Sequence, residues 1–109
     1  MKKFPESDWK KLRGLKDDAL NLSCERVFEK IEKLSHGRKG QEHKAYLDLW
    51  KLIEKEDKEI GIMFDDLKRS NAYYKLAAWK RNNVISDEKF SEFSDETRQT
   101  VELLMEIIR

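Results

Sequence analysis

Apolar residues recur every three or four positions along most of the chain, which is the spacing of one face of an α-helix. In the N-terminal part this stripe runs from Trp9 to Leu34 without a break. Ser7 precedes the stripe in the position of a helix N-cap, and Gly37 follows it as a residue that readily ends a helix. The pattern predicts one helix over about 8–36.

A second stripe begins after the segment 37–40, which is so short that the chain must reverse direction there. The apolar positions then continue to Leu67 and predict a helix over about 42–70 that runs back along the first, forming an antiparallel helical hairpin. One position in this stripe holds a carboxylate, Glu56 or Asp57, where an apolar residue is expected. This carboxylate either turns outward or pairs with a base from the facing helix. We expect the outward orientation, because buried ionised groups are rare and costly unless they are paired.

The remaining third of the chain predicts shorter helices separated by polar turns. Ser70 favours a kink or a short break, and Asn82 with Asn83 favours a turn. Ser86 has the position of an N-cap, and Ser94 begins the last helix. The short helices span about 72–81, 87–93 and 94 to the end. The last helix carries two apolar stripes, so we expect it to have contacts on two sides: Val101, Leu104, Met105 and Ile108 on one, Leu103 and Ile107 on the other.

The composition fits a single all-α domain over 1–109. The 109 residues include only four Gly, one Pro and one Cys. So few turn residues exclude a turn-rich β-sandwich and a glycine-rich phosphate-binding loop, and one Cys excludes a disulfide framework or a multi-thiolate zinc site.

The two long helices are too long for a compact molecule of this size. Each would measure about 44 Å, whereas a compact globule of this length is about 34 Å across. Either a helix breaks, at Gly14 or Gly61, or the molecule is a rod whose hairpin is only partly covered by the rest of the chain. In the second case we expect a bundle-like fold completed by a homodimer. In architecture alone, such a dimeric hairpin resembles the small Rop-type RNA-binding bundles, and a shared fold does not imply a shared function.

Short apolar runs and an N-terminus without the pattern of a signal peptide predict a cytoplasmic protein. The longest apolar run, about 60–64, is interrupted by Gly61 and is far shorter than the roughly 20 residues that span a bilayer. Polar residues follow Met1-Lys2-Lys3 in place of the apolar stretch of a signal peptide. We therefore expect no membrane-spanning segment and no membrane partner.

No catalytic or metal-binding constellation stands out. Cys24 lies on the apolar stripe of the first helix, where a packed small side chain is the better interpretation than a nucleophile. Glu32, His36 and His43 have a spacing that would permit a surface metal site, but a helix-end histidine and a solvated one explain the same residues. We expect no enzymatic activity, no cofactor and no bound metal ion.

Charge is segregated along a chain whose net charge is only +1. Residues 54–66 contain six acids and two Lys, and residues 84–109 contain seven acids and three bases. Between them, residues 68–81, the basic aromatic segment, contain five bases, three aromatics and no acid. The candidate binding residues of this segment are Lys68, Arg69, Tyr73, Tyr74, Lys75, Trp79, Lys80 and Arg81.

Two functions fit this pattern. Helical surfaces without catalytic groups favour a protein–protein interaction module, such as an adaptor, an antagonist or an immunity-type partner, that acts through the basic aromatic segment and the last helix. The alternative is a nucleic-acid-binding regulator whose cations contact phosphates and whose aromatics stack on bases. Its contacts would be Lys68, Arg69, Lys75, Lys80 and Arg81, joined by Lys10, Lys11 and Arg13. A plainer account assigns the aromatics to the core and the cations to solvent or to acidic neighbours.

Overall fold

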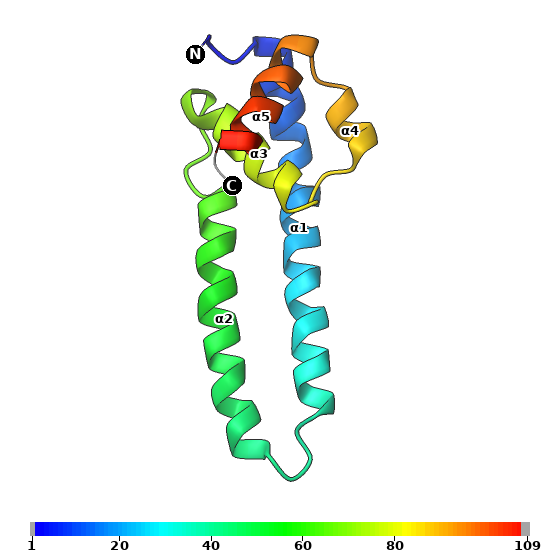
Figure 1. Ribbon diagram of the computed structural model, residues 1–109, viewed down its shortest axis with the longest axis vertical. Helices are drawn as coiled ribbons and strands as arrows, with labels where there is room; N and C mark the ends of the chain where they lie inside the picture. Colours follow the sequence, from blue (N-terminus) through cyan, green and yellow to red (C-terminus); the bar gives the residue numbers. More distant parts are fainter. Residues whose placement is uncertain (1, 108–109) are drawn as a thin grey trace.

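The computed structural model describes residues 2–107, and this part of the chain is all-α. Two long helices, α1 (Glu6–His36) and α2 (Glu42–Phe64), form the antiparallel hairpin expected from the sequence (Figure 1). The shorter elements η1 (Arg69–Asn71), α3 (Ala72–Arg81), α4 (Asp87–Ser91) and α5 (Asp95–Ile107) gather around one end of it. The molecule is therefore a rod of 55 × 23 × 23 Å with a radius of gyration of 16.7 Å.

The first helix is continuous and begins earlier than predicted. Its N-cap residue is Pro5 and no side chain caps it, so the prediction of Ser7 as the N-cap was wrong. The fixed φ of Pro5, −59°, already suits a helix start, and the carbonyl of Pro5 accepts a bond from Trp9 N at 2.9 Å. Gly14 and Gly61 both lie inside unbroken helix. The length conflict is thus resolved by a rod and not by a broken helix.

The second helix ends at Phe64, so the prediction of a helix to about residue 70 was wrong. Asp65 is extended, with ψ of 145°, and Asp66 adopts the left-handed conformation with φ of 56°. The side chain of Asn71 holds this break by donating to Asp66 O at 2.8 Å and accepting from Lys68 N at 3.0 Å. Leu67 keeps the helical spacing past the break, which is why the apolar pattern does not reveal it.

The helix α3 folds back onto the end of α2 through Trp79. Its indole Nε1 donates to Met63 O at 2.9 Å, and its ring stacks on Phe64 with centroids 5.2 Å apart. These contacts satisfy one of the free carbonyls at the end of α2 while burying two large aromatic rings.

The core lies entirely at the end of the rod that α3, α4 and α5 cover. Its buried apolar residues come from Phe4, the first half of α1, the end of α2 and residues 72–104. The largest fully buried ones are Phe4, Leu12, Leu76, Trp79 and Val101. We use the term "arm" for residues 24–62, the uncovered part of the hairpin. In the arm no apolar residue is buried, and the only buried residue is Glu56.

The last two helices confirm some of the predicted details and correct others. Ser86 caps α4 as predicted, accepting from Lys89 N at 3.0 Å, but the helix ends at Ser91 rather than at 93. In α5 the expected contacts on two sides are not present in the described chain, because Leu103 and Ile107 are exposed. Ile108 lies outside the described residues.

A buried carboxylate joins the start of α1 to the start of α5. Asp8 is fully buried and accepts three hydrogen bonds, from Ser94 N at 3.1 Å, Ser94 Oγ at 2.6 Å and Thr97 Oγ1 at 2.5 Å. Burial by itself raises the pKa of Asp8, but the bonds from Ser94 and Thr97 outweigh burial, and the pKa lies below its ordinary value of 3.8.

We predict that Asp8→Asn lowers the free energy of unfolding by about 1–3 kcal/mol at pH 7, because an amide nitrogen replaces an acceptor of charge-assisted bonds. Folding lowers the pKa of Asp8. The contribution of its carboxylate to the free energy of unfolding is therefore complete above the ordinary pKa and is lost as the pH falls through the pKa of the folded state. Urea unfolding at pH 7 and pH 3 should therefore show a difference between variant and wild type that shrinks in acid. Asp17→Asn, at an exposed site on the same helix, is the control. An unchanged midpoint for Asp8→Asn at pH 7 would contradict this role.

Candidate functional site

The structure divides the basic aromatic segment between core and surface. Trp79 has no exposed surface, and Tyr73 is buried with its ring edge against Phe4, the centroids 4.8 Å apart. These two candidate binding residues therefore support the fold and do not face a partner. Tyr74 is the exposed aromatic of the segment.

Three of the candidate cations pair with acids of the same chain. Arg69 Nη1 lies 2.7 Å from Glu6 Oε2, and its Nε donates to Phe4 O at 2.6 Å. Lys68 pairs with Asp66 at 3.3 Å. Lys80 pairs with Asp87 and lies over the Phe90 ring, 5.2 Å from its centroid. Arg69 thus joins η1 to the start of α1, and Lys80 joins α3 to α4, whereas the Lys68–Asp66 pair is local.

The other two candidate cations donate to main-chain carbonyls near helix ends. Lys75 Nζ donates to Ile62 O at 2.6 Å, and Arg81 Nη2 donates to Met105 O at 3.2 Å. The last carbonyls of a helix lack partners within the helix and carry its negative dipole end, so a cation is well suited to them.

Two cations outside the segment, Arg26 and Lys11, also donate to main-chain carbonyls near helix ends. The sequence pattern did not indicate this role for them. Arg26 Nη2 donates to Asn83 O at 2.6 Å and its Nη1 donates to Asn82 O at 2.5 Å, at the end of α3. Lys11 Nζ donates to Glu92 O at 2.6 Å, just after α4. Their partners lie more than fifty residues away along the chain, so only the fold brings them together.

An open cleft between α2 and α3 contains three of the candidate residues. It has a volume of about 660 Å³ and is lined by Tyr74, Lys75 and Arg81 together with Ile62, Asn71 and Glu59. Because Lys75 and Arg81 already donate to carbonyls, the cleft offers mixed polar and apolar contacts and no free cationic cluster.

The arm presents a second and more apolar surface. Phe28, Tyr46 and Trp50 are 59%, 56% and 55% exposed, and Ile53 is 41% exposed. Tyr46 and Trp50 lie one turn apart with their rings edge to face, 6.5 Å between centroids. Side chains of this size are normally buried, so an exposed row of them indicates a binding surface.

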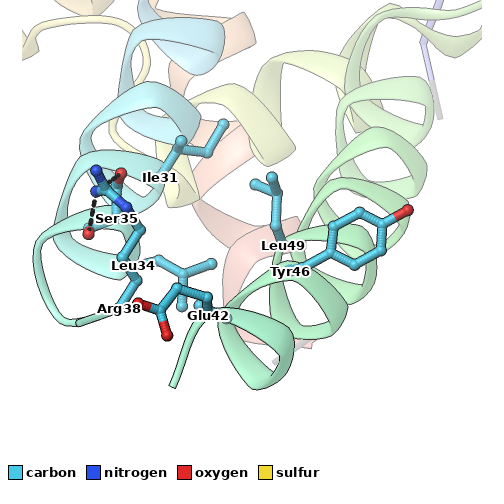
Figure 2. Close-up of a pocket in the computed structure, with 8 residues that line it drawn as sticks. Ile31, Leu34, Ser35, Arg38, Glu42, Tyr46 and Leu49 are labelled. Carbon is cyan, nitrogen blue, oxygen red and sulfur yellow. Dashed lines mark hydrogen bonds between the residues drawn. The ribbon is translucent and has the colours of Figure 1, made fainter. Parts of the chain in front are cut away.

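Two apolar hollows follow the seam between the helices of the arm. The one near the tip measures about 210 Å³ and the one in the middle about 170 Å³. Figure 2 shows Ile31 and Leu49 pointing toward each other across the tip hollow, while Tyr46 extends away from α1. The lining residues are Ile31, Leu34, Ser35, Arg38, Glu42, Ala45, Tyr46 and Leu49 at the tip, and Cys24, Val27, Phe28, Ile53, Glu56, Asp57 and Ile60 in the middle.

Both hollows open on the same side of the arm. Phe28 and Ser35 are seven residues apart on α1, and Tyr46 and Ile53 are seven residues apart on α2, which is two helical turns in each case. We use the term "arm groove" for this apolar face, formed by Phe28 and Ile31 of α1 and by Tyr46, Leu49, Trp50 and Ile53 of α2.

The carboxylate in the second stripe is paired and not turned outward, so our expectation for it was wrong. Glu56 Oε1 lies 2.5 Å from Nζ of Lys30, which reaches across from α1. The pair costs less than an unpaired buried charge, and it joins the two helices of the arm where apolar packing is thin.

The structure shows where the candidate nucleophile and the candidate metal ligands lie. Cys24 lines the middle hollow as a half-buried side chain on the apolar stripe. Within residues 2–107, Glu32, His36 and His43 do not form a metal site, since no group of three His, Cys, Asp or Glu is close enough to hold an ion.

None of the described helices has a stretch both long and apolar enough to cross a membrane.

Comparisons with models of known protein families, with curated proteins and with solved structures found no match for this chain.

We predict that Lys75→Met lowers the free energy of unfolding by about 1 kcal/mol, because it leaves a carbonyl at the end of α2 without its charged donor. Lys58→Met, which removes a lysine with no hydrogen bond or ion pair among the described residues, is the matched control and should leave stability nearly unchanged. Urea unfolding of the two variants beside the wild type measures this. Equal unfolding midpoints for all three proteins would show that the Lys75 contact contributes nothing.

Proposed function

We propose that this protein is a non-enzymatic protein–protein interaction module that binds another polypeptide through its arm groove. The observation that carries the proposal is the contrast between the two ends of the rod. One end has a complete core, whereas the arm keeps large aromatic and aliphatic side chains half exposed along two adjacent helices.

The amount of exposed surface supports this proposal. The accessible surface of the chain is 7694 Å², compared with about 6400 Å² expected for a compact monomer of this mass. The excess of about 1300 Å² exceeds the roughly 800 Å² that one partner contributes to a standard interface. At about 25 cal/mol per Å² of apolar area, covering the groove would provide a substantial driving force for association.

The proposed working surface differs from the one expected from the sequence. The basic aromatic segment has two buried aromatics and five cations that each contact another part of the chain. This arrangement favours neither a protein nor a nucleic acid as a partner at that segment. The homodimer stays a prediction, because a second copy is one of the polypeptides that could cover the groove.

We predict that Trp50→Ser weakens the binding of a specific protein partner at least tenfold. Leu47→Ser is the matched control. Trp50 packs edge to face on Tyr46, which lines the tip hollow, whereas Leu47 is exposed about 100° around the same helix from Tyr46. Tagged proteins are used as baits in nuclease-treated lysate, and each protein retained by wild type and by Leu47→Ser is then purified. Calorimetry then measures the dissociation constant of the complex between each purified partner and each bait. This constant should be at least tenfold higher for Trp50→Ser than for wild type, since a central aromatic anchor is removed.

Two results would contradict the proposal. One is a purified partner that binds wild type and Trp50→Ser equally well. The other is capture of nucleic acid alone from untreated lysate, with loss of binding in Arg81→Met and not in Trp50→Ser.

A further inference from the structure

On the basis of the proposed function, we propose that the arm groove binds an amphipathic helix of a different protein, one whose apolar stripe is bordered by Lys or Arg on both sides. The proposal combines the apolar groove with the charge of its two edges.

The α1 edge of the groove is acidic. Glu25 lies three residues before Phe28 and Glu32 lies four residues after it, and these spacings place both carboxylates beside Phe28 on the helix surface. Both side chains are exposed, and neither takes part in an ion pair within the described chain.

The α2 edge is acidic as well. Asp57 lies four residues after Ile53 and lines the middle hollow, and Glu54 lies four residues after Trp50. These two carboxylates are also exposed and also have no ion pair among residues 2–107. The middle of the groove is thus apolar along its floor and has acids along both sides, whereas Arg38 lines the hollow at the tip.

The lysines of the arm lie away from the groove. Lys30 is two residues from Phe28, and Lys51 and Lys55 are each two residues from Ile53, a spacing of about 160° around a helix. They lie toward the opposite side of the arm. Glu54 shares a surface hollow with Lys51, Lys55 and Lys58, so the edge acids without such lysine neighbours are Glu25, Glu32 and Asp57.

This charge pattern selects among the possible occupants. A second copy packed face to face would bring acidic edges against acidic edges, and an anionic membrane or a nucleic acid would be repelled in the same way. A helix with an apolar stripe and basic borders would pack its stripe on the apolar floor of the groove and place its cations beside the acidic edges. From Cys24 to Ser35 the groove follows eleven helical steps, about 17 Å, so it matches roughly three turns of the bound helix.

Two labelled synthetic helical peptides test this proposal. They share one Leu stripe at helical spacing and differ only in the bordering residues, Lys in one and Glu in the other. Fluorescence anisotropy with the full chain in 50 mM salt should give at least tenfold tighter binding of the Lys-bordered peptide. The difference should shrink in 500 mM salt, where exposed charges are screened. A peptide of the same Lys and Leu composition with the stripe scrambled should bind at least tenfold more weakly.

Charge reversal locates the effect. The triple variant Glu25→Lys, Glu32→Lys and Asp57→Lys should prefer the Glu-bordered peptide. The matched control carries Glu88→Lys, Glu92→Lys and Glu102→Lys, three exposed acids outside the arm, and has the same net charge. It should keep the wild-type preference.

Several outcomes would overturn the proposal. They are equal binding of the Lys-bordered and Glu-bordered peptides, equal binding of the scrambled peptide, no binding of any peptide, and reversal of the preference by the control variant. Sedimentation of a dimer that Trp50→Ser dissociates would also overturn it and would identify a second copy as the occupant. Two of these outcomes would still support the proposed function, polypeptide binding by the groove. One is the dimer that Trp50→Ser dissociates. The other is equal binding of both striped peptides, provided that Trp50→Ser abolishes it.

Discussion

Trp79 anchors α3 to the end of α2, and this contact determines how the rest of the chain can pack. Its bond to Met63 O and its stacking on Phe64 turn the chain back at the point where the second long helix ends. The segment that follows then covers only the nearer half of a rod 55 Å long. A complete core and an uncovered arm are two consequences of the same reversal.

Besides the apolar core, charged groups that bond to the backbone near helix ends hold the short helices at the covered end. Asp8 accepts from the first residues of α5, and Lys11, Arg26, Lys75 and Arg81 donate to carbonyls near the ends of other helices. Helices of five to thirteen residues have many unpaired end groups for their length, so such contacts matter more here than in a long-helix bundle. Part of the high charge content of the sequence is used in this way.

The arm combines exposure with order. Its helices continue from the core without a break, and the Lys30–Glu56 pair joins them across the seam. A rigid two-helix surface loses little conformational entropy when it binds, which suits it to hold a partner helix. No apolar side chain of the arm is buried, so the core forms without the arm groove, and the proposed binding face can stay apolar.

Much of the fold was predictable from periodicity and turn chemistry. The hairpin, its turn after residue 36, the cap at Ser86 and the turn at Asn82–Asn83 all follow from local patterns, because helix spacing and capping act within a few residues. The left-handed Asp66 and the end of α2 at Phe64 did not follow, since Leu67 continues the apolar spacing while the Asn71 side chain holds the break through Asp66 O and Lys68 N.

The roles of the candidate residues also depended partly on local sequence and partly on distant contacts. The sequence by itself determined which face of each helix is apolar and where charge is concentrated. Only the tertiary structure decided that Tyr73 and Trp79 are buried, that Lys75 and Arg81 meet carbonyls, and that Phe28 and Trp50 stay exposed. The physical reason is that periodicity reports the preference of a side chain for burial, whereas burial itself depends on which distant segment reaches that side chain.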